Sequence, residues 1–145
     1  MKLKKIIFMG KSQSGKTTLC QKLHDMAVSY RKTQAIEQYL NAIDTPGEYL
    51  ENRHYYSALI ISAADAKVIG ITADPLEKEN YIPPAFAMTF SRPVIGIITK
   101  TGLADKTQIK KAELALKNGG ITKIFKVDCI SNSGVEELFN YLEEV

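Results

Sequence analysis

The feature that most constrains this chain is a phosphate-loop motif, Gly-Lys-Ser-Gln-Ser-Gly-Lys-Thr, at residues 10–17. It directly follows an apolar run from Ile6 to Met9 that has the composition of a strand. Its two glycines let consecutive backbone N–H groups turn inward around phosphate oxygens, and the helix that follows points its positive end at them. The motif therefore requires a strand, a tight loop and a helix in that order.

The motif also predicts roles for its side chains. Lys16 is placed to reach the β- and γ-phosphates of a nucleoside triphosphate, and Thr17 is placed to bind Mg²⁺. A glycine-containing turn that binds nothing is the alternative, and the full match to the motif disfavours it. The other residues expected around the phosphates are Gly10, Lys11, Ser12, Gln13, Ser14, Gly15 and Thr18.

The rest of the chain alternates short apolar segments with segments of helical spacing. Strands are expected at residues 3–9, 42–44, 67–73, 94–100 and 121–128. Because the apolar runs are nearly continuous, these strands are expected to be buried on both faces and therefore parallel. The pattern predicts an α/β fold: a single P-loop NTPase domain over residues 1–145, with a mostly parallel central sheet and helices on both faces.

Several short signals predict helix boundaries and ligand positions. Helix starts are expected at Asp74-Pro75-x-Glu77, Asp105-x-x-Gln108 and Ser133-x-x-Glu136, because each places an acid or amide three residues after a capping side chain. Asn118-Gly119-Gly120 predicts a helix end, and a short helix is expected around residues 85–90. Ligands of such sheets bind beyond the carboxyl ends of the strands. The residues to examine are therefore 10–17, 44–48, 74, 99–102 and 129–133.

A second motif, Asp-Thr-Pro-Gly, begins at Asp44, 28 residues after Lys16. An Asp at a strand end can hold Mg²⁺ through a water, and the N–H of Gly47 can donate to the γ-phosphate. Such a tetrapeptide alone is ordinarily a turn, but its distance from a phosphate loop favours a metal and switch element. Thr33, between the motifs, is placed to complete the Mg²⁺ shell, with a plain surface connection as the alternative.

Together these residues resemble the EutP/PduV family of GTPase-like proteins of ethanolamine and propanediol utilisation in bacteria. The resemblance covers nearly the whole chain and rests on the phosphate loop and on residues 31–37, 44–49 and 53–60. It implies a compact P-loop NTPase sheet. It also implies a cytoplasmic protein associated with a bacterial microcompartment, with microcompartment proteins as partners.

One difference from an ordinary small GTPase lies at Glu48. Small GTPases usually place a glutamine there to orient the attacking water. A carboxylate can orient or deprotonate water, but it also repels the γ-phosphate, so slow hydrolysis is expected.

A second difference lies at the base end. The sequence Thr-Lys-Thr-Gly that begins at Thr99 corresponds to the guanine-reading N-K-x-D motif, and Gly102 stands where the acid would be. Losing two hydrogen bonds to a carboxylate, at roughly 1.5 to 3 kcal/mol each, removes about two to four orders of magnitude of guanine preference. Lys100 can still cover a purine face, and Ser131 and Asn132 can add contacts from the last loop. The nucleotide is therefore expected to be ATP or GTP, and the sequence predicts no guanine selectivity that would decide between them.

Charge and cysteine content exclude several other classes of function. The net charge of +3 is small and spread along the chain, so no nucleic-acid partner is implied, and no apolar run is long enough to span a membrane. Cys20 and Cys129 belong to no metal pattern and are expected to be buried, reduced thiols. His24 and His54 lack a second ligand at metal spacing.

The leading hypothesis is Mg²⁺-dependent binding and hydrolysis of a nucleoside triphosphate. One alternative is a small-molecule kinase that transfers the γ-phosphate of ATP to a small carboxylate such as acetate. Another is a nucleotide-dependent scaffold of a microcompartment with negligible turnover. The expected catalytic residues are Lys16, Thr33, Asp44, Gly47 and Glu48, and the expected metal ligands are Thr17, Thr33 and Asp44.

Overall fold

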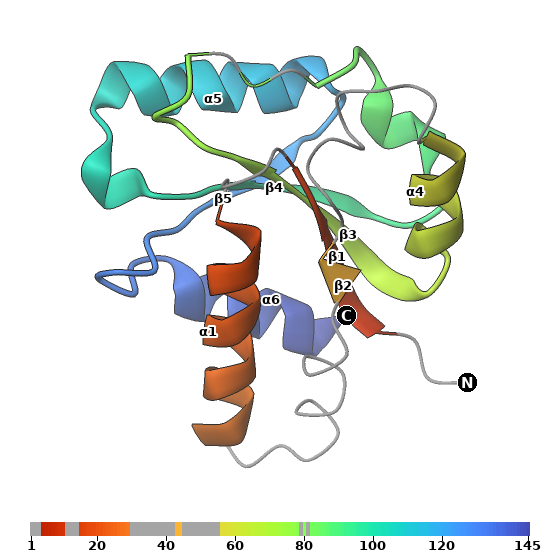
Figure 1. Ribbon diagram of the computed structural model, residues 1–145, viewed down its shortest axis with the longest axis horizontal. Coiled ribbons are helices and arrows are strands. Elements are labelled where there is room, and N and C mark those ends of the chain that lie inside the picture. The colour runs from red at the N-terminus through yellow and green to blue at the C-terminus, as the bar shows by residue number, and fades with distance from the viewer. Residues whose placement is uncertain (1–3, 11–14, 30–42, 45–55, 79, 81) are drawn as a thin grey trace.

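A five-stranded sheet forms the centre of the molecule (Figure 1). The structure is a computed structural model and describes residues 4–10, 15–29, 43–44, 56–78, 80 and 82–145. The strands are adjacent in the order β2-β1-β3-β4-β5, and all four pairings are parallel. Their bounds are β1 Lys4–Met9, β2 Ile43–Asp44, β3 Ala66–Ala73, β4 Val94–Ile98 and β5 Lys123–Lys126. The predicted parallel sheet is confirmed.

Helices cover both faces of this sheet, as expected (Figure 1). One apolar cluster joins the sheet to α1 and α6, and the other joins it to α4 and α5. The helices are α1 Lys16–Ser29, α4 Tyr56–Ala63, α5 Lys106–Asn118 and α6 Val135–Glu144, with 3-10 turns η2 Phe86–Thr89 and η3 Thr101–Leu103. The turn η2 confirms the short helix expected around residues 85–90.

The first strand shows why the apolar runs are continuous. Ile6 and Phe8 belong to the cluster under α1 and α6, whereas Ile7 and Met9 belong to the cluster under α4 and α5. All four side chains are fully buried. Because successive side chains of a strand point to opposite faces, a strand between two helical layers must be apolar at every position.

The helix α5 begins and ends where the sequence predicts. The Asp105 side chain accepts the Gln108 N–H at 2.8 Å, and the Gln108 side chain accepts the Asp105 N–H at 2.9 Å. This is a complete capping box. Gly119 follows the last residue of the helix and donates its N–H to the Ala115 and Leu116 carbonyls.

Of the other two predicted helix starts, the one at Asp74 is wrong, and the one at Ser133 lies one residue before the observed N-cap of α6. Asp74 forms a turn, in which its Oδ1 accepts the Leu76 N–H at 2.9 Å, and no helix follows in the described residues up to Ile82. The helix α6 begins after Gly134 without a side-chain cap. Gly134 has φ 77°, and a Cβ there would collide with the Lys126 carbonyl oxygen, so packing on the last strand sets this start.

Two other expectations need correction. Strands β4 and β5 are shorter than predicted, because the backbone turns at Lys100, with φ 55°, and leaves the ladder after Lys126. Cys20 and Cys129 are free thiols as expected, but each is only partly buried, at the edge of a core cluster. None of the helices in the described part of the chain has the length and apolar character that a membrane crossing needs.

Candidate functional site

The phosphate-loop motif lies between the end of β1 and the start of α1. Lys16 is buried, with 6% of its surface exposed, and its Nζ donates to the Gly10 carbonyl at 2.9 Å. Gly15 has φ 99°, a left-handed conformation that glycine adopts without strain, and its carbonyl accepts the Leu19 N–H at 3.0 Å. Both ends of the loop are therefore in place, whereas residues 11–14 lie outside the described residues.

Of the predicted magnesium ligands, the structure places two near this loop. Thr17 is exposed in the first turn of α1, and Thr18 follows it. The backbone of Asp44 pairs with Phe8 at the end of β1, which brings β2 to the same edge of the sheet. The predicted residues Thr33, Gly47 and Glu48 lie outside the described residues.

The carboxyl ends of β1, β3 and β4 are joined by threonine side chains. Thr72 Oγ1 donates to the Met9 carbonyl at 3.3 Å, and Thr99 Oγ1 donates to the Ala73 carbonyl at 3.4 Å. Thr99 is buried against the phosphate loop, because its Cβ lies 3.4 Å from the position that a Cβ on Gly15 would occupy. The structure thus brings two predicted parts of the site, the phosphate loop and the segment that begins at Thr99, into contact.

Lys100 is held by a carboxylate for which the sequence predicted a different role. Its Nζ lies 2.7 Å from Asp74 Oδ2, and only 5% of the Asp74 side chain is exposed. Asp74 was expected to cap a helix, whereas it orients a candidate base contact. The available signal was its position just past the end of β3.

The last loop is organised by a second buried acid, Asp128, which belongs to none of the predicted motifs. Its Oδ2 accepts the Ser131 hydroxyl at 2.9 Å and its Oδ1 accepts the Ile130 N–H at 3.2 Å. Ser131 and Asn132, both predicted base contacts, are exposed on this loop. The available signal was an acid at the end of the last predicted strand, the same kind of position as Asp74.

The environment of this loop also affects the neighbouring thiol. Burial raises the pKa of Cys129, Lys22 opposes that shift, and the charge of Asp128 adds to it. The Cys129 thiol is therefore held in its neutral form and is a poor nucleophile or metal ligand at neutral pH. Within the described residues, no group of three His, Cys, Asp or Glu side chains is arranged to hold a metal ion.

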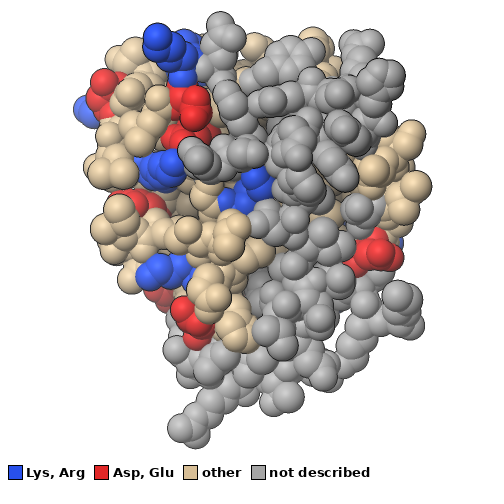
Figure 2. Space-filling model, viewed as in Figure 1, with Lys and Arg blue, Asp and Glu red and all other residues tan. Residues whose placement is uncertain are grey.

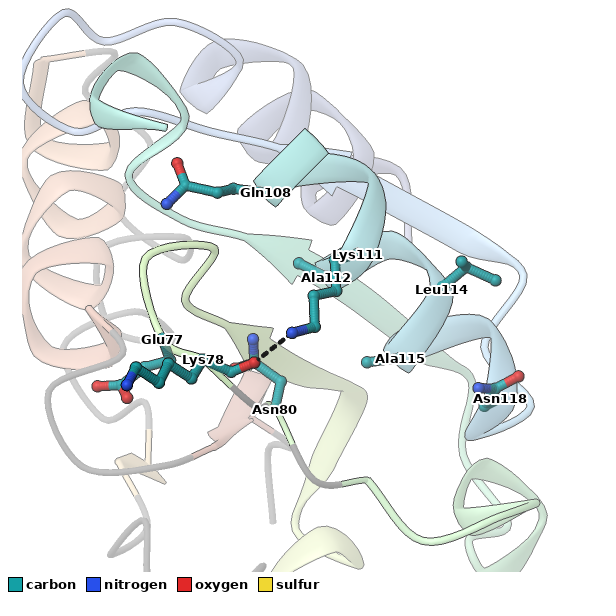
Figure 3. Close-up of a pocket in the computed structure, with 9 residues that line it drawn as sticks. All are labelled: Glu77, Lys78, Asn80, Gln108, Lys111, Ala112, Leu114, Ala115 and Asn118. Atoms are coloured by element: carbon teal, nitrogen blue, oxygen red, sulfur yellow. Dashed lines mark hydrogen bonds between the residues drawn. The ribbon is translucent and has the colours of Figure 1, made fainter. Parts of the chain in front are cut away.

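Two hollows lie outside the motif residues. One, of about 330 Å³, is formed by the turn after β3 and by α5, where Lys111 Nζ donates to the Lys78 carbonyl at 2.7 Å (Figure 3). The other, of about 310 Å³, lies between α1 and the start of α6, and the predicted base contact Asn132 is among the residues that line it. Lys and Arg side chains are interspersed with Asp and Glu over the described part of the face in Figure 2. The described residues therefore form no patch of a single charge sign on this face.

The family is decided by comparison with known proteins. The model of the family described as "Ethanolamine utilisation - propanediol utilisation" (PduV-EutP) matches residues 3–144. The chain belongs to the PduV-EutP family. This confirms the resemblance that the motifs suggested.

Two curated members of the PduV-EutP family illustrate the similarity. The propanediol utilization protein PduV of Citrobacter freundii is 42% identical over 140 residues, covering 97% of this chain and 93% of that protein. A protein of Escherichia coli (strain K12) named "Probable acetate kinase EutP" is 31% identical over 142 residues, covering 97% of this chain and 89% of that protein.

Solved structures confirm the P-loop GTPase-like fold of this family member. The cytosolic domain of the T. maritima FeoB iron transporter, in its GMPPNP form, superposes with a TM-score of 0.65 at 18% identity, over 99% of this chain and 63% of that chain. The FeoB G-domain from Methanococcus jannaschii gives a TM-score of 0.62 at 16% identity, over 99% of this chain and 97% of that chain. At these identities the likeness shows the fold alone.

Proposed function

We propose that this chain binds a nucleoside triphosphate with Mg²⁺ and hydrolyses it, in ethanolamine or propanediol utilisation. The observation that carries the proposal is the position of Lys16: a buried lysine at the junction of β1 and α1, with its Nζ on the carbonyl of Gly10. Membership of the PduV-EutP family supports the metabolic setting.

In this proposal Lys16 is already directed toward the phosphate site. Its hydrogen bond to the Gly10 carbonyl has a neutral acceptor. A β- or γ-phosphate oxygen carries negative charge, and a charge-assisted hydrogen bond is roughly twice as strong as a neutral one. A phosphate oxygen of a bound triphosphate would therefore compete favourably with the Gly10 carbonyl for the Lys16 ammonium.

The other predicted residues complete the proposed site. Thr17, Thr33 and Asp44 would hold Mg²⁺, and the Gly47 N–H would contact the γ-phosphate. Glu48 would act on the attacking water, with slow hydrolysis as the consequence. These residues fit the chemistry, because hydroxyl and carboxylate oxygens are the ligands that Mg²⁺ prefers.

A second candidate function is phosphoryl transfer from ATP to acetate. The names of the EutP relatives, which are 31–32% identical to this chain, favour it. The phosphate loop would serve both reactions, because each requires the γ-phosphate to be positioned and its charge stabilised. The acceptor, water or a carboxylate, distinguishes them.

Replacing Lys16 tests the proposal. Lys16→Ala should bind ATP and GTP about 10- to 100-fold more weakly than the parent in the presence of Mg²⁺, because a hydrogen bond to a charged group contributes roughly 1.5 to 3 kcal/mol. Titration calorimetry measures the affinity, and release of inorganic phosphate measures turnover. Lys110→Ala, which removes an exposed lysine on α5, is the matched control.

The outcomes separate the candidates. Equal affinity of Lys16→Ala and the parent would refute nucleotide binding through this loop. Binding without hydrolysis in a single turnover would select the scaffold. Accumulation of acetyl phosphate, trapped with hydroxylamine in the presence of ATP and acetate, would select the kinase.

A further inference from the structure

Asp128 occupies the space beside Gly102, the residue that stands where GTPases place their guanine-reading acid. A Cβ at Gly102 would collide with Asp128 Oδ2 and would lie 3.0 Å from its Cγ. Gly102 does not have a positive φ, so the backbone there does not require glycine. Glycine is required because the carboxylate of Asp128 fills the place of a side chain at residue 102.

We propose that Asp128 is the guanine-reading carboxylate of this protein, supplied from the end of β5 instead of from residue 102. The proposal rests on the proposed function, since it takes the triphosphate to be bound at residues 10–17. It replaces the open choice between ATP and GTP by a preference for GTP.

Hydrogen bonds of the segments that follow β4 and β5 hold Gly102 and Asp128 in place. The N–H and hydroxyl of Thr101 donate to the Val127 carbonyl at 3.3 and 3.1 Å, which ties the segment after β4 to the end of β5. The N–H of Asp128 donates to the Ser133 carbonyl at 2.9 Å, which closes the last loop. The carboxylate is therefore fixed from both sides before any ligand binds.

The carboxylate has acceptor capacity to spare. Asp128 is 6% exposed, and its oxygens accept one N–H from Ile130 and one hydroxyl from Ser131. Two carboxylate oxygens offer about four lone-pair directions. The hydrogen bonds from described residues use two of them, which leaves about two for donors on a ligand. No ion pair joins Asp128 to a described residue, although buried charges are ordinarily paired.

The position relative to the phosphates fits a nucleotide. Thr99 packs beside Gly15 of the phosphate loop, and two residues later Thr101 bonds to Val127, the residue before Asp128. A nucleotide with its phosphates in the loop would extend along this edge of the sheet, past Lys100, with its base at Asp128.

Guanine and adenine differ at the edge that a carboxylate would read. Guanine presents the N1–H and the exocyclic amine at C2 as adjacent donors, and a carboxylate accepts both. Adenine presents the N1 lone pair, which would face the carboxylate and repel it. A site with Asp128 should therefore prefer GTP to ATP by about two to four orders of magnitude, on the basis of two charge-assisted hydrogen bonds.

Asp128→Asn tests the role by exchanging one acceptor for a donor. Xanthine differs from guanine by a carbonyl at C2, so an asparagine can accept the xanthine N1–H and donate to that carbonyl. The variant should lose about 100-fold in GTP affinity and gain affinity for XTP, with ATP binding little changed. Asp105→Asn, an exposed acid at the start of α5, is the control.

A second pair of variants keeps the test decisive if Asp128→Asn fails to fold. Asp128→Ala should abolish the preference for GTP. The double variant Asp128→Ala with Gly102→Asp moves the carboxylate across the contact and should restore the preference. Titration of full-length chains with Mg²⁺ and each of GTP, ATP and XTP measures all four variants and the parent.

The results separate this inference from the proposed function. A parent that binds ATP and GTP equally, or prefers ATP, overturns the role of Asp128 and leaves nucleotide binding intact. Equal loss of ATP and GTP affinity in Asp128→Asn assigns Asp128 a structural task and also overturns it. A parent that binds no nucleotide overturns the proposed function itself.

Discussion

Lys100 illustrates how much of the candidate site depends on single residues in uncommon conformations. A lysine with φ 55° costs roughly 1 to 2 kcal/mol relative to ordinary backbone. The 2.7 Å contact of its Nζ with the buried carboxylate of Asp74 offsets that cost. Strained residues held in this way concentrate at functional sites. The strain at Lys100 therefore supports the assignment of this edge of the sheet as the site.

The raised pKa of Cys129 leads to a prediction about thiol reactivity. In a Cys20→Ala background at pH 8, iodoacetamide should modify Cys129 more slowly in the folded chain than in guanidinium, because the folded thiol resists ionisation. Lys22→Ala should slow the reaction further, since Lys22 lowers this pKa. Asp128→Asn should speed it, since the Asp128 charge raises the pKa. Mass spectrometry follows the rates, and faster reaction in Lys22→Ala would contradict the assignment.

The raised pKa of Cys129 also determines how this thiol makes the free energy of unfolding depend on pH. A thiol whose pKa is higher in the folded chain binds its proton more tightly there than in the unfolded chain. The contribution of this thiol to the free energy of unfolding is fully present below the ordinary thiol pKa of about 8.5. It is lost as the pH rises above that value and through the pKa of the thiol in the folded chain. Cys129 therefore favours folding at neutral pH and ceases to do so in alkaline solution.

At the scale of helices and strands, a helix start that depends on neighbouring residues could be predicted from the sequence, and one that depends on a tertiary contact could not. The capping box at Asp105 involves residues three apart, so a sequence window contains the whole interaction. The start of α6 depends on the fit of Gly134 against the Lys126 carbonyl, a contact between two elements. The Ser133-x-x-Glu136 pattern resembles a capping box, but the N-cap position of α6 is occupied by Gly134, which has no side chain to cap the helix.

The capping box makes a testable contribution to the stability of α5. Asp105→Ala should lower the free energy of unfolding by about 1 kcal/mol, because it leaves the Gln108 N–H without its acceptor. Urea denaturation measures the change. Asp105→Ser, which retains a capping oxygen, should lose less. Equal losses in the two variants would show that the box does not stabilise the helix.

At the scale of the whole molecule, the strand and helix around the phosphate-loop motif could be predicted from the sequence, whereas the contact of Gly102 with Asp128 could not. Residues 10–17 are contiguous, so their pattern contains the strand, the loop and the helix that they need. Gly102 follows β4 and Asp128 follows β5, and the parallel pairing of these two strands brings the two residues together. A sequence motif read at Gly102 alone showed a missing acid, whereas the fold supplies a carboxylate beside it.

This arrangement predicts that nucleotide binding stabilises the whole sheet. A ligand held at Lys16 and along Thr99 would contact the carboxyl ends of strands that are far apart in sequence. At a concentration 100 times its Kd it should add about 2.7 kcal/mol to the free energy of unfolding, or about 5 to 10 °C in Tm.

Thermal denaturation with Mg²⁺ and GTP measures this shift, and Lys16→Ala should reduce it strongly at the same GTP concentration. Omitting Mg²⁺ should also reduce it, because the metal neutralises charge on the phosphates. A shift of equal size in Lys16→Ala would mean that the stabilising ligand binds elsewhere. A hollow such as the one beside Lys111 would then become the candidate, since the phosphate loop would no longer account for the gain.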